Sequence, residues 1–468
     1  MAWRGMARIL ILAPLLFALG ACDGGGDKRP VMVDTVEDGA KGNVERVVLR
    51  SALAQGLVRF DATGQVEPGL AERWNMVDDG RSYIFRLGDA TWSDGRPVTA
   101  EQVVVALRRA VRPEAAHRLT PFLRSIDEIV AMTPQVIEVR LKRPNTELLT
   151  LLAQPELAVI RGAQGTGPLR RLRGSGIRLR APADPEGPPP VAADEVRLRG
   201  ARAALAVARY AEKRSDLVLG GKFADWPLVA AANPRPADVR VDPARGLFGF
   251  AFVARDGFLS TALGRAAVAM AMQGANLPGA IDSGWGPADT ILPERLDSAA
   301  DPALPAWRNL TEEQRWTTAR AQVAGYGQPV RVRVALPDGP GATLLWGRIA
   351  AALSRIGIAG GRVAMTAPAD LRLIDRVAPY DSARWYLATA CRTCSMEAMT
   401  LIAAARDADN LPDRAQRLAT ADAAMAADVA FVPVARPWRW SLVAPRLRAF
   451  QANARAVHPL NHLRADTR

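Results

Sequence analysis

The sequence predicts an α/β protein built from two lobes. Its 468 residues are too many for one compact domain. Segments with the period of strands alternate with helical segments, and residues 195–219 and 330–365 both have the order strand, helix, strand. A proline-containing break at residues 233–236 lies between these two units and indicates a connection between lobes.

The composition is that of a globular protein with a full core, because 49% of the residues are hydrophobic and 23% are charged. Sixty-one Lys and Arg residues against 48 Asp and Glu give a net charge of +13. The arginines are scattered along the chain and do not gather on one element between aromatic residues, so no nucleic-acid binding is expected. Attraction to an anionic membrane surface is the expected use of this charge.

Residues 1–22 have the pattern of a lipoprotein signal peptide. An apolar run at residues 9–19 follows two arginines and is too short to span a bilayer permanently. The run leads into Leu-Gly-Ala-Cys, so Cys22 is expected to become the lipidated N-terminal residue; an unlipidated signal peptide is the alternative. Residues 23–43 show little hydrophobic pattern and are expected to form a flexible tether.

Short local patterns predict the first elements of the body. Residues 46–49 are expected to form a strand, and the helical spacing of apolar residues at 70–74 predicts a short helix. Asp-Asp-Gly at residues 78–80 predicts a tight turn, because Asp tolerates and Gly favours positive φ. Alternating aromatic and polar residues at 83–87 predict a strand. Thr99 followed by Gln102 is a capping box that begins a helix.

The rest of the chain continues the alternation. Strands are expected at residues 136–141, 169–172, 177–180, 195–199, 217–219, 246–252, 330–336 and 362–365, and helices at 145–153, 201–212, 263–272, 344–356 and 412–427. The proline-rich stretch at residues 182–190 cannot hold a regular element and is expected to be an exposed loop.

The residues from Gln65 to Val111 resemble the family of bacterial extracellular solute-binding proteins that includes the oligopeptide-, dipeptide- and nickel-binding proteins of ABC importers. The family pattern is PxLAxxW, a DDG turn, an aromatic strand and then WxDGxPxTAxDV. The matching residues are Pro68, Leu70, Ala71, Trp74, Asp79, Gly80, Tyr83, Phe85, Trp92, Asp94, Gly95, Pro97, Thr99, Ala100 and Val103, with Gln102 in place of the usual acid. A GTGP turn at residues 165–168 and a similar ending extend the resemblance over residues 44–463.

This resemblance implies the type II periplasmic-binding-protein fold of the large, peptide-binding class, with a hinge and an interlobe cleft. Lobe I is expected to contain residues 44–232 and 430–468, and lobe II residues 233–429, with connections near 231–239 and 428–433. The expected protein is a periplasmic monomer, anchored to the cell membrane by its lipid, that delivers a peptide or other small solute to an ABC permease complex in the inner membrane. A degenerate binding fold that acts as a sensor or chaperone, or that binds a metal chelate, is the alternative.

Cys391 and Cys394 form a CxxC pair that has three interpretations in an oxidising compartment: a disulfide, two metal ligands or a redox motif. No other thioredoxin feature accompanies the pair, and His458 and His462 are poorly spaced to complete a metal set. A disulfide is therefore the expected form.

The resemblance also implies where ligand contacts lie. Peptide-binding members carry an acidic residue for the peptide's amino terminus after an aromatic strand of lobe II. Here Trp385 takes the aromatic place, and CRTCSMEA replaces the acidic motif, with Glu397 as the nearest acid. Arg392 is expected to prefer an anionic group. Trp385, Arg392, Ser395 and Glu397 are thus candidate ligand contacts, with Arg392 and Trp385 lining the cleft.

Two more candidate contacts lie on lobe I. The family's first ligand-facing turn corresponds to residues 52–60, where Gln55 or its neighbour Ala54 replaces a common acid. Thr166 lies in the GTGP turn, which is either a plain turn, the favoured interpretation, or a ligand contact. No catalytic residue, cofactor or metal site is predicted, because the chain has three histidines and no nucleophile elbow, HExxH or Walker motif.

Overall fold

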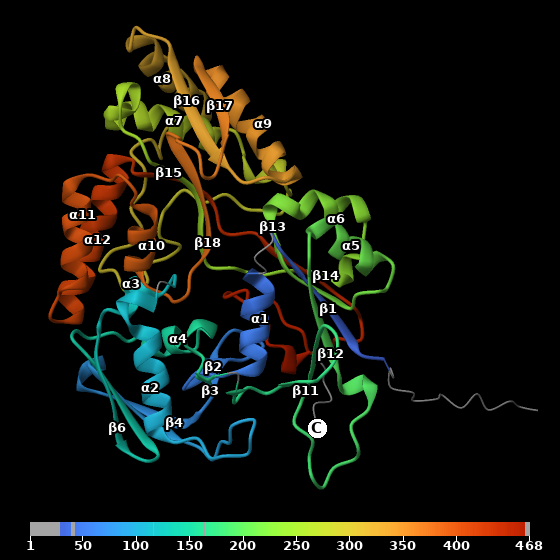
Figure 1. Ribbon diagram of the computed structural model, residues 1–468. Helices are drawn as coiled ribbons and strands as arrows, with labels where there is room; N and C mark the ends of the chain where they lie inside the picture. Colours follow the sequence, from blue (N-terminus) through green and yellow to red (C-terminus); the bar gives the residue numbers. More distant parts are fainter. Residues whose placement is uncertain (1–28, 39–42, 116, 163, 464–468) are drawn as a thin grey trace, which may run out of the picture.

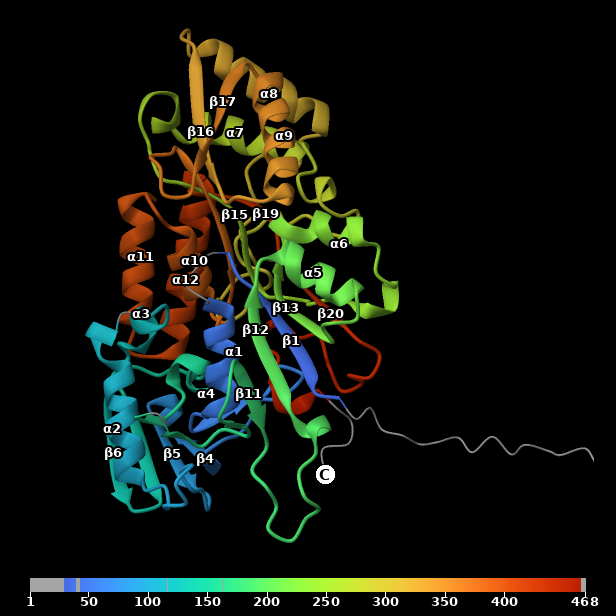
Figure 2. The same ribbon diagram turned by 45° about the vertical axis from the view of Figure 1, so that its right-hand side comes forward.

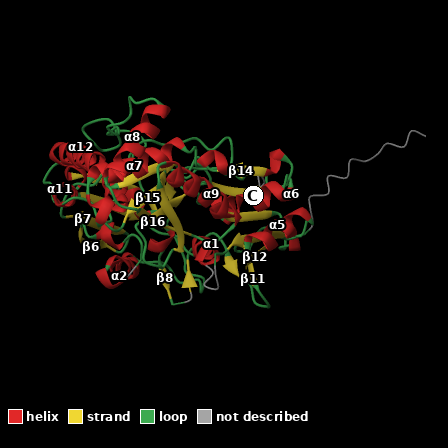
Figure 3. Ribbon diagram, turned by 90° about the horizontal axis from the view of Figure 1, so that it is seen from above, coloured by secondary structure: helices red, strands yellow, loops and turns green. Residues whose placement is uncertain are grey.

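The computed structural model describes residues 29–38, 43–115, 117–162 and 164–463. Three β-sheets with helices packed on them form an elongated molecule (Figures 1 and 2). Seen from above, α11 and α12 lie toward one end of the molecule and α5 and α6 toward the other (Figure 3). The predicted signal peptide and Cys22 lie outside the described residues. None of the described helices combines the length and apolar character needed to cross a membrane.

The largest sheet has seven strands in the order β10-β11-β12-β1-β13-β20-β14. Its central strands β12, β1 and β13 are parallel, so their carboxyl ends meet at one edge, and the outer strands are antiparallel. The strands are β1 (Val31–Val36), β10 (Arg170–Arg171), β11 (Ile177–Arg180), β12 (Val196–Ala201), β13 (Leu217–Lys222), β14 (Val239–Val241) and β20 (Arg439–Val443). The helices α1 (Asn43–Leu53) and α5 (Ala203–Ala211) pack against it, and α6 (Trp226–Ala232) packs on α5.

The second sheet has five strands in the order β17-β16-β18-β15-β19. Strands β17, β16 and β18 are parallel, whereas β15 is antiparallel to both of its neighbours. The strands are β15 (Gly246–Phe252), β16 (Val330–Leu336), β17 (Ile358–Ala364), β18 (Leu371–Val377) and β19 (Phe431–Ala435). Its helices are α7 (Ala262–Gly274), α8 (Glu312–Gly325) and α9 (Pro340–Arg355).

A four-stranded antiparallel sheet, β4-β5-β7-β6, is inserted between α1 and β10. Its buried side chains form one apolar cluster with those of α10, α11 and α12, which lie above it in Figure 1. The elements are β4 (Ala71–Val77), β5 (Ser82–Leu87), β6 (Ile126–Thr133), β7 (Val136–Leu141), α2 (Ala100–Val111), α3 (Thr120–Leu123), α4 (Leu148–Leu152), α10 (Ala383–Ala390), α11 (Met396–Arg406) and α12 (Leu411–Asp428), with two hairpins, β2 (Val58–Phe60) with β3 (Val66–Pro68) and β8 (Ile160–Arg161) with β9 (Gln164–Gly165).

The chain passes between the seven-stranded and five-stranded sheets at residues 242–245 and again at 436–438. Both passages lie after the predicted connections near 231–239 and 428–433. The proline-containing break at 233–236 is instead a loop between α6 and β14, which still pairs with β20 of the seven-stranded sheet.

The predicted tether at residues 23–43 is wrong at Val31–Val36, which form β1 at the centre of the seven-stranded sheet, and at Asn43, where α1 begins. Asp34 interrupts the run of hydrophobic residues in this strand, so the hydrophobic pattern alone did not reveal the strand. Its carboxylate is fully buried and lies 2.8 Å from guanidinium nitrogens of both Arg199 and Arg209.

Two local predictions have the wrong element type. Residues 46–49 belong to α1 and not to a strand, since α1 packs as a helix against β1 and β12. Residues 70–74 fall mainly in β4, because antiparallel pairing places Trp74 opposite Phe85 of β5 and this tertiary contact overrides the helical spacing.

The predictions of a turn at residues 78–80, of two strand–helix–strand units and of a loop at residues 182–190 are confirmed. The turn at residues 78–80 has positive φ at all three positions. At the start of α2, the Gln102 side-chain oxygen accepts the Thr99 backbone N–H at 3.4 Å, which is one half of the predicted capping box. The two strand–helix–strand units form β12-α5-β13 and β16-α9-β17, although β1 inserts between β12 and β13. Residues 182–190 contain no helix or strand.

Candidate ligand-binding cleft

A cavity of about 1000 Å³ lies between the seven-stranded and five-stranded sheets. From the first sheet it is lined by residues that end or follow β1, β12 and β13, such as Asp38, Arg202 and Lys222. From the second sheet it is lined by residues that follow β16 and β17, by the carboxyl end of β15 and by residues 372–376 of β18. Open α/β sheets bind ligands beyond the carboxyl ends of their parallel strands. Both sheets therefore present this edge to the same cavity.

The wall from the seven-stranded sheet contains one carboxylate without a partner, Asp225. Burial raises the pKa of Asp225 to about 6, with a further contribution from the Asp38 carboxylate, whereas Lys222 opposes the shift. Asp38 pairs with Lys222. The Glu37 carboxylate accepts hydrogen bonds from the first backbone N–H groups of α1, including that of Glu45 at 2.6 Å. Among the described residues, the Asp225 side chain has no hydrogen bond or ion pair.

The wall from the five-stranded sheet is basic. Arg372 and Arg376 of β18 and Arg392 of the CxxC turn all line the cavity. Partial burial lowers the pKa of Arg392, and the charges of Arg376 and Arg372 lower it further. The three guanidinium groups therefore face one space and repel one another.

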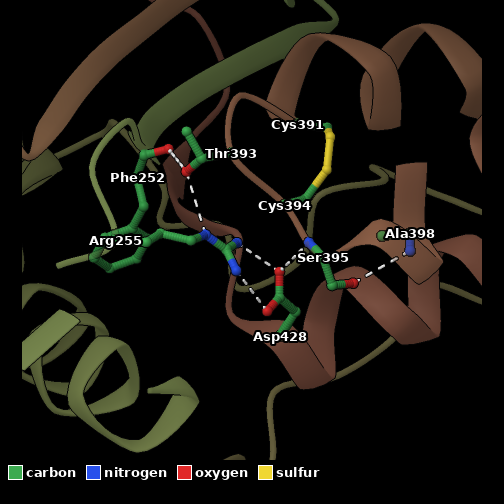
Figure 4. Close-up of a disulfide and its surroundings, with 8 residues drawn as sticks. All are labelled: Phe252, Arg255, Cys391, Thr393, Cys394, Ser395, Ala398 and Asp428. Carbon is green, nitrogen blue, oxygen red and sulfur yellow. Dashed lines mark hydrogen bonds and ion pairs between the residues drawn. A yellow bond between two sulfur atoms is a disulfide. The ribbon is translucent and has the colours of Figure 1, made fainter. Parts of the chain in front are cut away.

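The turn at residues 391–394 links α10 to α11, and its two cysteines are paired (Figure 4). The Thr393 hydroxyl donates to the Phe252 carbonyl at 2.8 Å and accepts from Arg255 at 3.2 Å. Arg255 also forms a two-point ion pair with Asp428, whose carboxylate accepts from the backbone N–H of Ser395 at 2.9 Å. These contacts fix the turn, so that Arg392 is presented from a rigid base.

Sequence reasoning missed Arg255 and Asp428. A local signal existed for Asp428, because an acid in the last turn of a helix opposes the helix dipole and therefore suggests a partner elsewhere. Burial opposes ionisation of Asp428, but hydrogen bonds from Arg255 and Ser395 outweigh it and lower the pKa of the carboxyl. Arg255 lies 173 residues away in the chain and has no local signal.

The other predicted contacts on the five-stranded side lie away from the cavity. Trp385 is 4% exposed in the apolar cluster of α10, with its ring edge-on to Tyr386 at 4.9 Å, and it does not line the cavity. The ring belongs to the buried face of α10. Ser395 caps α11 by accepting a hydrogen bond from the Ala398 N–H at 3.2 Å. Glu397 is exposed in the first turn of α11.

Thr166 and Gln55 also lie outside the large cavity. Gln55 lines a separate cavity of about 30 Å³, and its side-chain oxygen accepts from Arg59 at 3.4 Å. Thr166 is buried, and its hydroxyl has no hydrogen-bond partner within the described part of the chain. A Cβ on Gly165 would lie 2.1 Å from the Leu53 carbonyl oxygen, and one on Gly167 2.4 Å from the Ala54 nitrogen. The close approach to the end of α1 explains these glycines.

No metal centre is visible in residues 29–38, 43–115, 117–162 and 164–463, where no three His, Cys, Asp or Glu side chains gather to hold an ion. His458 faces Asp242 at 3.2 Å and His462 faces Glu67 at 3.4 Å. These two histidines are therefore engaged with carboxylates close to the seven-stranded sheet.

A cavity between two α/β units, with the chain crossing between them twice, is the architecture of a two-lobed periplasmic binding protein. Residues 65–302 match the model of the bacterial extracellular solute-binding proteins, family 5. The chain belongs to this family.

Curated relatives match over short stretches. The probable deoxycholate-binding periplasmic protein YgiS of Escherichia coli K12 is 36% identical over 123 residues, which are 22% of this chain and 23% of that protein. The periplasmic oligopeptide-binding protein OppA of Haemophilus influenzae is 43% identical over 72 residues, 15% of this chain and 13% of that protein. The matched stretches thus span less than a quarter of either relative, and both relatives are binding proteins.

The fold extends over almost the whole chain. The crystal structure of Haemophilus influenzae OppA in complex with the peptide RPPGFSPFR aligns with a TM-score of 0.73 at 16% identity, covering 92% of this chain and 98% of that one. At this identity the likeness shows the fold, which is the predicted two-lobed one, and leaves the ligand to be argued from the residues of the cleft.

Proposed function

We propose that this chain is the substrate-binding protein of an ABC importer. It captures a peptide or other small solute in the cavity between its two lobes and delivers it to the permease complex in the inner membrane. The cavity carries the proposal, because about 1000 Å³ is enough for a small solute and polar side chains of both sheets converge on it. Membership in the solute-binding family supports the same role.

The two lobes of the proposal divide where the chain changes sheets. Lobe I holds the seven-stranded and four-stranded sheets, lobe II holds the five-stranded sheet with α10 to α12, and residues 242–245 and 436–438 form the hinge. Two short connections allow one lobe to rotate against the other, although the lobes share buried apolar clusters that must shear in this motion. Closure then encloses the ligand from both sides.

The proposed location is the periplasm, with a lipid on Cys22 that holds the monomeric protein at a membrane. The sequence pattern before Cys22 supports this anchor. Mass spectrometry of the protein extracted from its native membrane is expected to find an acylated Cys22 at the N-terminus. An unmodified Cys22, or a mature chain that begins elsewhere, would contradict the anchor without affecting the cleft.

The binding function is tested with protein purified from its own envelope. Small molecules released by denaturation are identified by mass spectrometry, and each is titrated back onto washed protein by calorimetry. One of them is expected to bind with a stoichiometry of one.

A Val253→Trp variant places a large ring on the cavity wall and should release none of this solute. Leu263→Trp, at a site 66% exposed on α7, is the matched control and should behave like the unmodified protein. If Val253→Trp carries the same solute as the unmodified protein, the cavity is not the binding site and the proposed function fails.

A further inference from the structure

We propose that the ligand of this cleft carries a compact oxyanion group, a carboxylate or a phosphate, and that Arg372, Arg376 and Arg392 bind it. This inference rests on the proposed solute-binding function and specifies the chemistry of the solute.

The three arginines form one surface. Arg372 and Arg376 are four residues apart in β18, so their side chains leave the same face of the strand. Arg392 comes from the fixed turn between α10 and α11. All three line the same cavity, which places a strand and a rigid turn around one possible anion.

None of the three contacts a carboxylate within the described residues. Arg372 donates to the backbone carbonyl of Ala367 at 2.9 Å, while the side chains of Arg376 and Arg392 have no hydrogen bond or ion pair there. Asp375 lies between Arg372 and Arg376 in sequence, but it points elsewhere and pairs with Arg439 at 2.8 Å.

Two neighbouring arginines, in contrast, do have acidic partners. Arg333 on β16 is paired with Asp370 at 2.8 Å, and Arg255 is paired with Asp428. Arg333 and Arg255 thus have acidic partners, whereas Arg372, Arg376 and Arg392 line the cavity without one in the described part of the chain. An oxyanion between the three guanidinium groups would remove their mutual repulsion and gain charge-assisted hydrogen bonds.

The opposite wall does not supply that anion. Glu37 is occupied at the start of α1, and Asp38 pairs with Lys222. The Asp225 carboxylate has no partner among the described residues, but it extends from the other lobe, in the short helical segment Phe223–Asp225 after β13. A solute with an anionic group toward β18 and a polar or cationic group toward Asp225 fits this charge distribution.

The test uses purified full-length protein and four probes: glutarate, its uncharged diamide glutaramide, inorganic phosphate and sodium chloride at matched ionic strength. Binding is followed by calorimetry and by the shift in melting temperature. Glutarate or phosphate is expected to bind and glutaramide and chloride are not, and whichever of the two anions binds more tightly identifies the oxyanion. Arg376→Gln and Arg392→Gln should each weaken binding of that anion by about tenfold, whereas Arg348→Gln, at an exposed site on α9 that does not line the cavity, should not.

The stability of the variants separates this role from a structural one. Removing an arginine that is repelled by its neighbours should leave the melting temperature without probe unchanged or higher. A clear fall for Arg376→Gln and Arg392→Gln would mean that these side chains hold the fold and would overturn the proposal. Failure of both anions to bind would also overturn it.

The two proposals can fail separately. If the solute released from the native protein is neutral and binds equally to the unmodified protein, Arg376→Gln and Arg392→Gln, the cleft binds solute but has no oxyanion site. If no solute binds in the cleft at all, the proposed function itself is wrong.

Discussion

Asp422 and Asp428, two carboxyl groups on α12, have pKa values shifted in opposite directions. The Asp428 carboxylate forms ion pairs with Arg255 and Arg265, and its pKa is lowered. Asp422 is 3% exposed and, among the described residues, accepts only the Ala303 backbone N–H, at 2.8 Å, so burial raises its pKa to about 6. The first carboxylate organises the turn beside the cleft, and the second makes the stability of α12 depend on pH.

Asp422→Asn is expected to stabilise the protein at pH 8 and to have little effect at pH 4. The pKa of the carboxyl is higher in the folded than in the unfolded chain, so its stabilising protonated form is fully present below about 3.8 and is lost as pH rises through about 6. The difference corresponds to at most about 3 kcal/mol. Denaturant unfolding at pH 4, 6 and 8 measures it. Asp301→Asn, at an exposed site, is the control; equal changes in both variants would contradict the argument.

Local residue chemistry was predictable, and distant pairing was not. Gln102 replaces the acid usual in the family, yet its side-chain oxygen still accepts from the Thr99 N–H and also from the Trp92 indole, at 2.7 Å. All three residues lie within one short segment. The pairs Arg255–Asp428 and Arg439–Asp375 join residues far apart in the chain, and their partners are selected only by the folded sheets.

The elements that sequence analysis missed are those whose burial depends on contacts with other elements. β1 is buried between two parallel neighbours, and its one acid is neutralised by Arg199 and Arg209, which belong to β12 and α5. Strands with a clear period of two, such as β5 and β7, were found from their own residues. For the site, Arg392 was placed at the cavity by its position in a replaced family motif, whereas Arg372 and Arg376 carry no signal until β18 is paired.

The CxxC turn is expected to matter more for binding than for stability. The turn is already held by Thr393 on Phe252 and by Ser395 on Asp428, and a ring of four residues restricts the unfolded chain little. The double variant Cys391→Ser, Cys394→Ser should lower the melting temperature by less than about 4 °C. Because Arg392 lies between the cysteines, the affinity for the anion that binds should fall by about tenfold.

A variant of the same network, Asp428→Ala, is expected to lower stability much more than the double cysteine variant does. Asp428→Ala leaves Arg255 and Arg265 without their partner and should cost about 3 kcal/mol of stability.

Thiol titration of the unmodified protein without reductant is the direct check that Cys391 and Cys394 are paired. Two free thiols, or a double Ser variant that binds normally, would refute the role given to the disulfide.

On the scale of the whole molecule, an aromatic cluster joins the two lobes next to the hinge. Phe223, at the end of β13, packs against Phe248 of β15 with ring centroids 4.9 Å apart, and Trp285 packs on Phe248 at 4.6 Å. Arg439 of the seven-stranded sheet reaches Asp375 of the five-stranded sheet. The two-lobed plan was predictable from the family pattern, whereas the proposed hinge lies several residues after the predicted connections, because strand pairing decides which sheet a segment joins.

The start of α9 is the point at which closure of the cleft can be tested. Gly341 in its first turn lies so close to the segment Phe223–Asp225 that an added Cβ would be 2.1 Å from the Phe223 carbonyl oxygen. Gly341→Ala should therefore hold the lobes apart, increasing the radius of gyration in solution scattering and weakening ligand binding. Gly347→Ala is the matched control on the same helix, where nothing lies within 4 Å; it should add about 1 kcal/mol of helix stability and leave scattering unchanged. If Gly341→Ala scatters and binds like the unmodified protein, this contact does not limit closure.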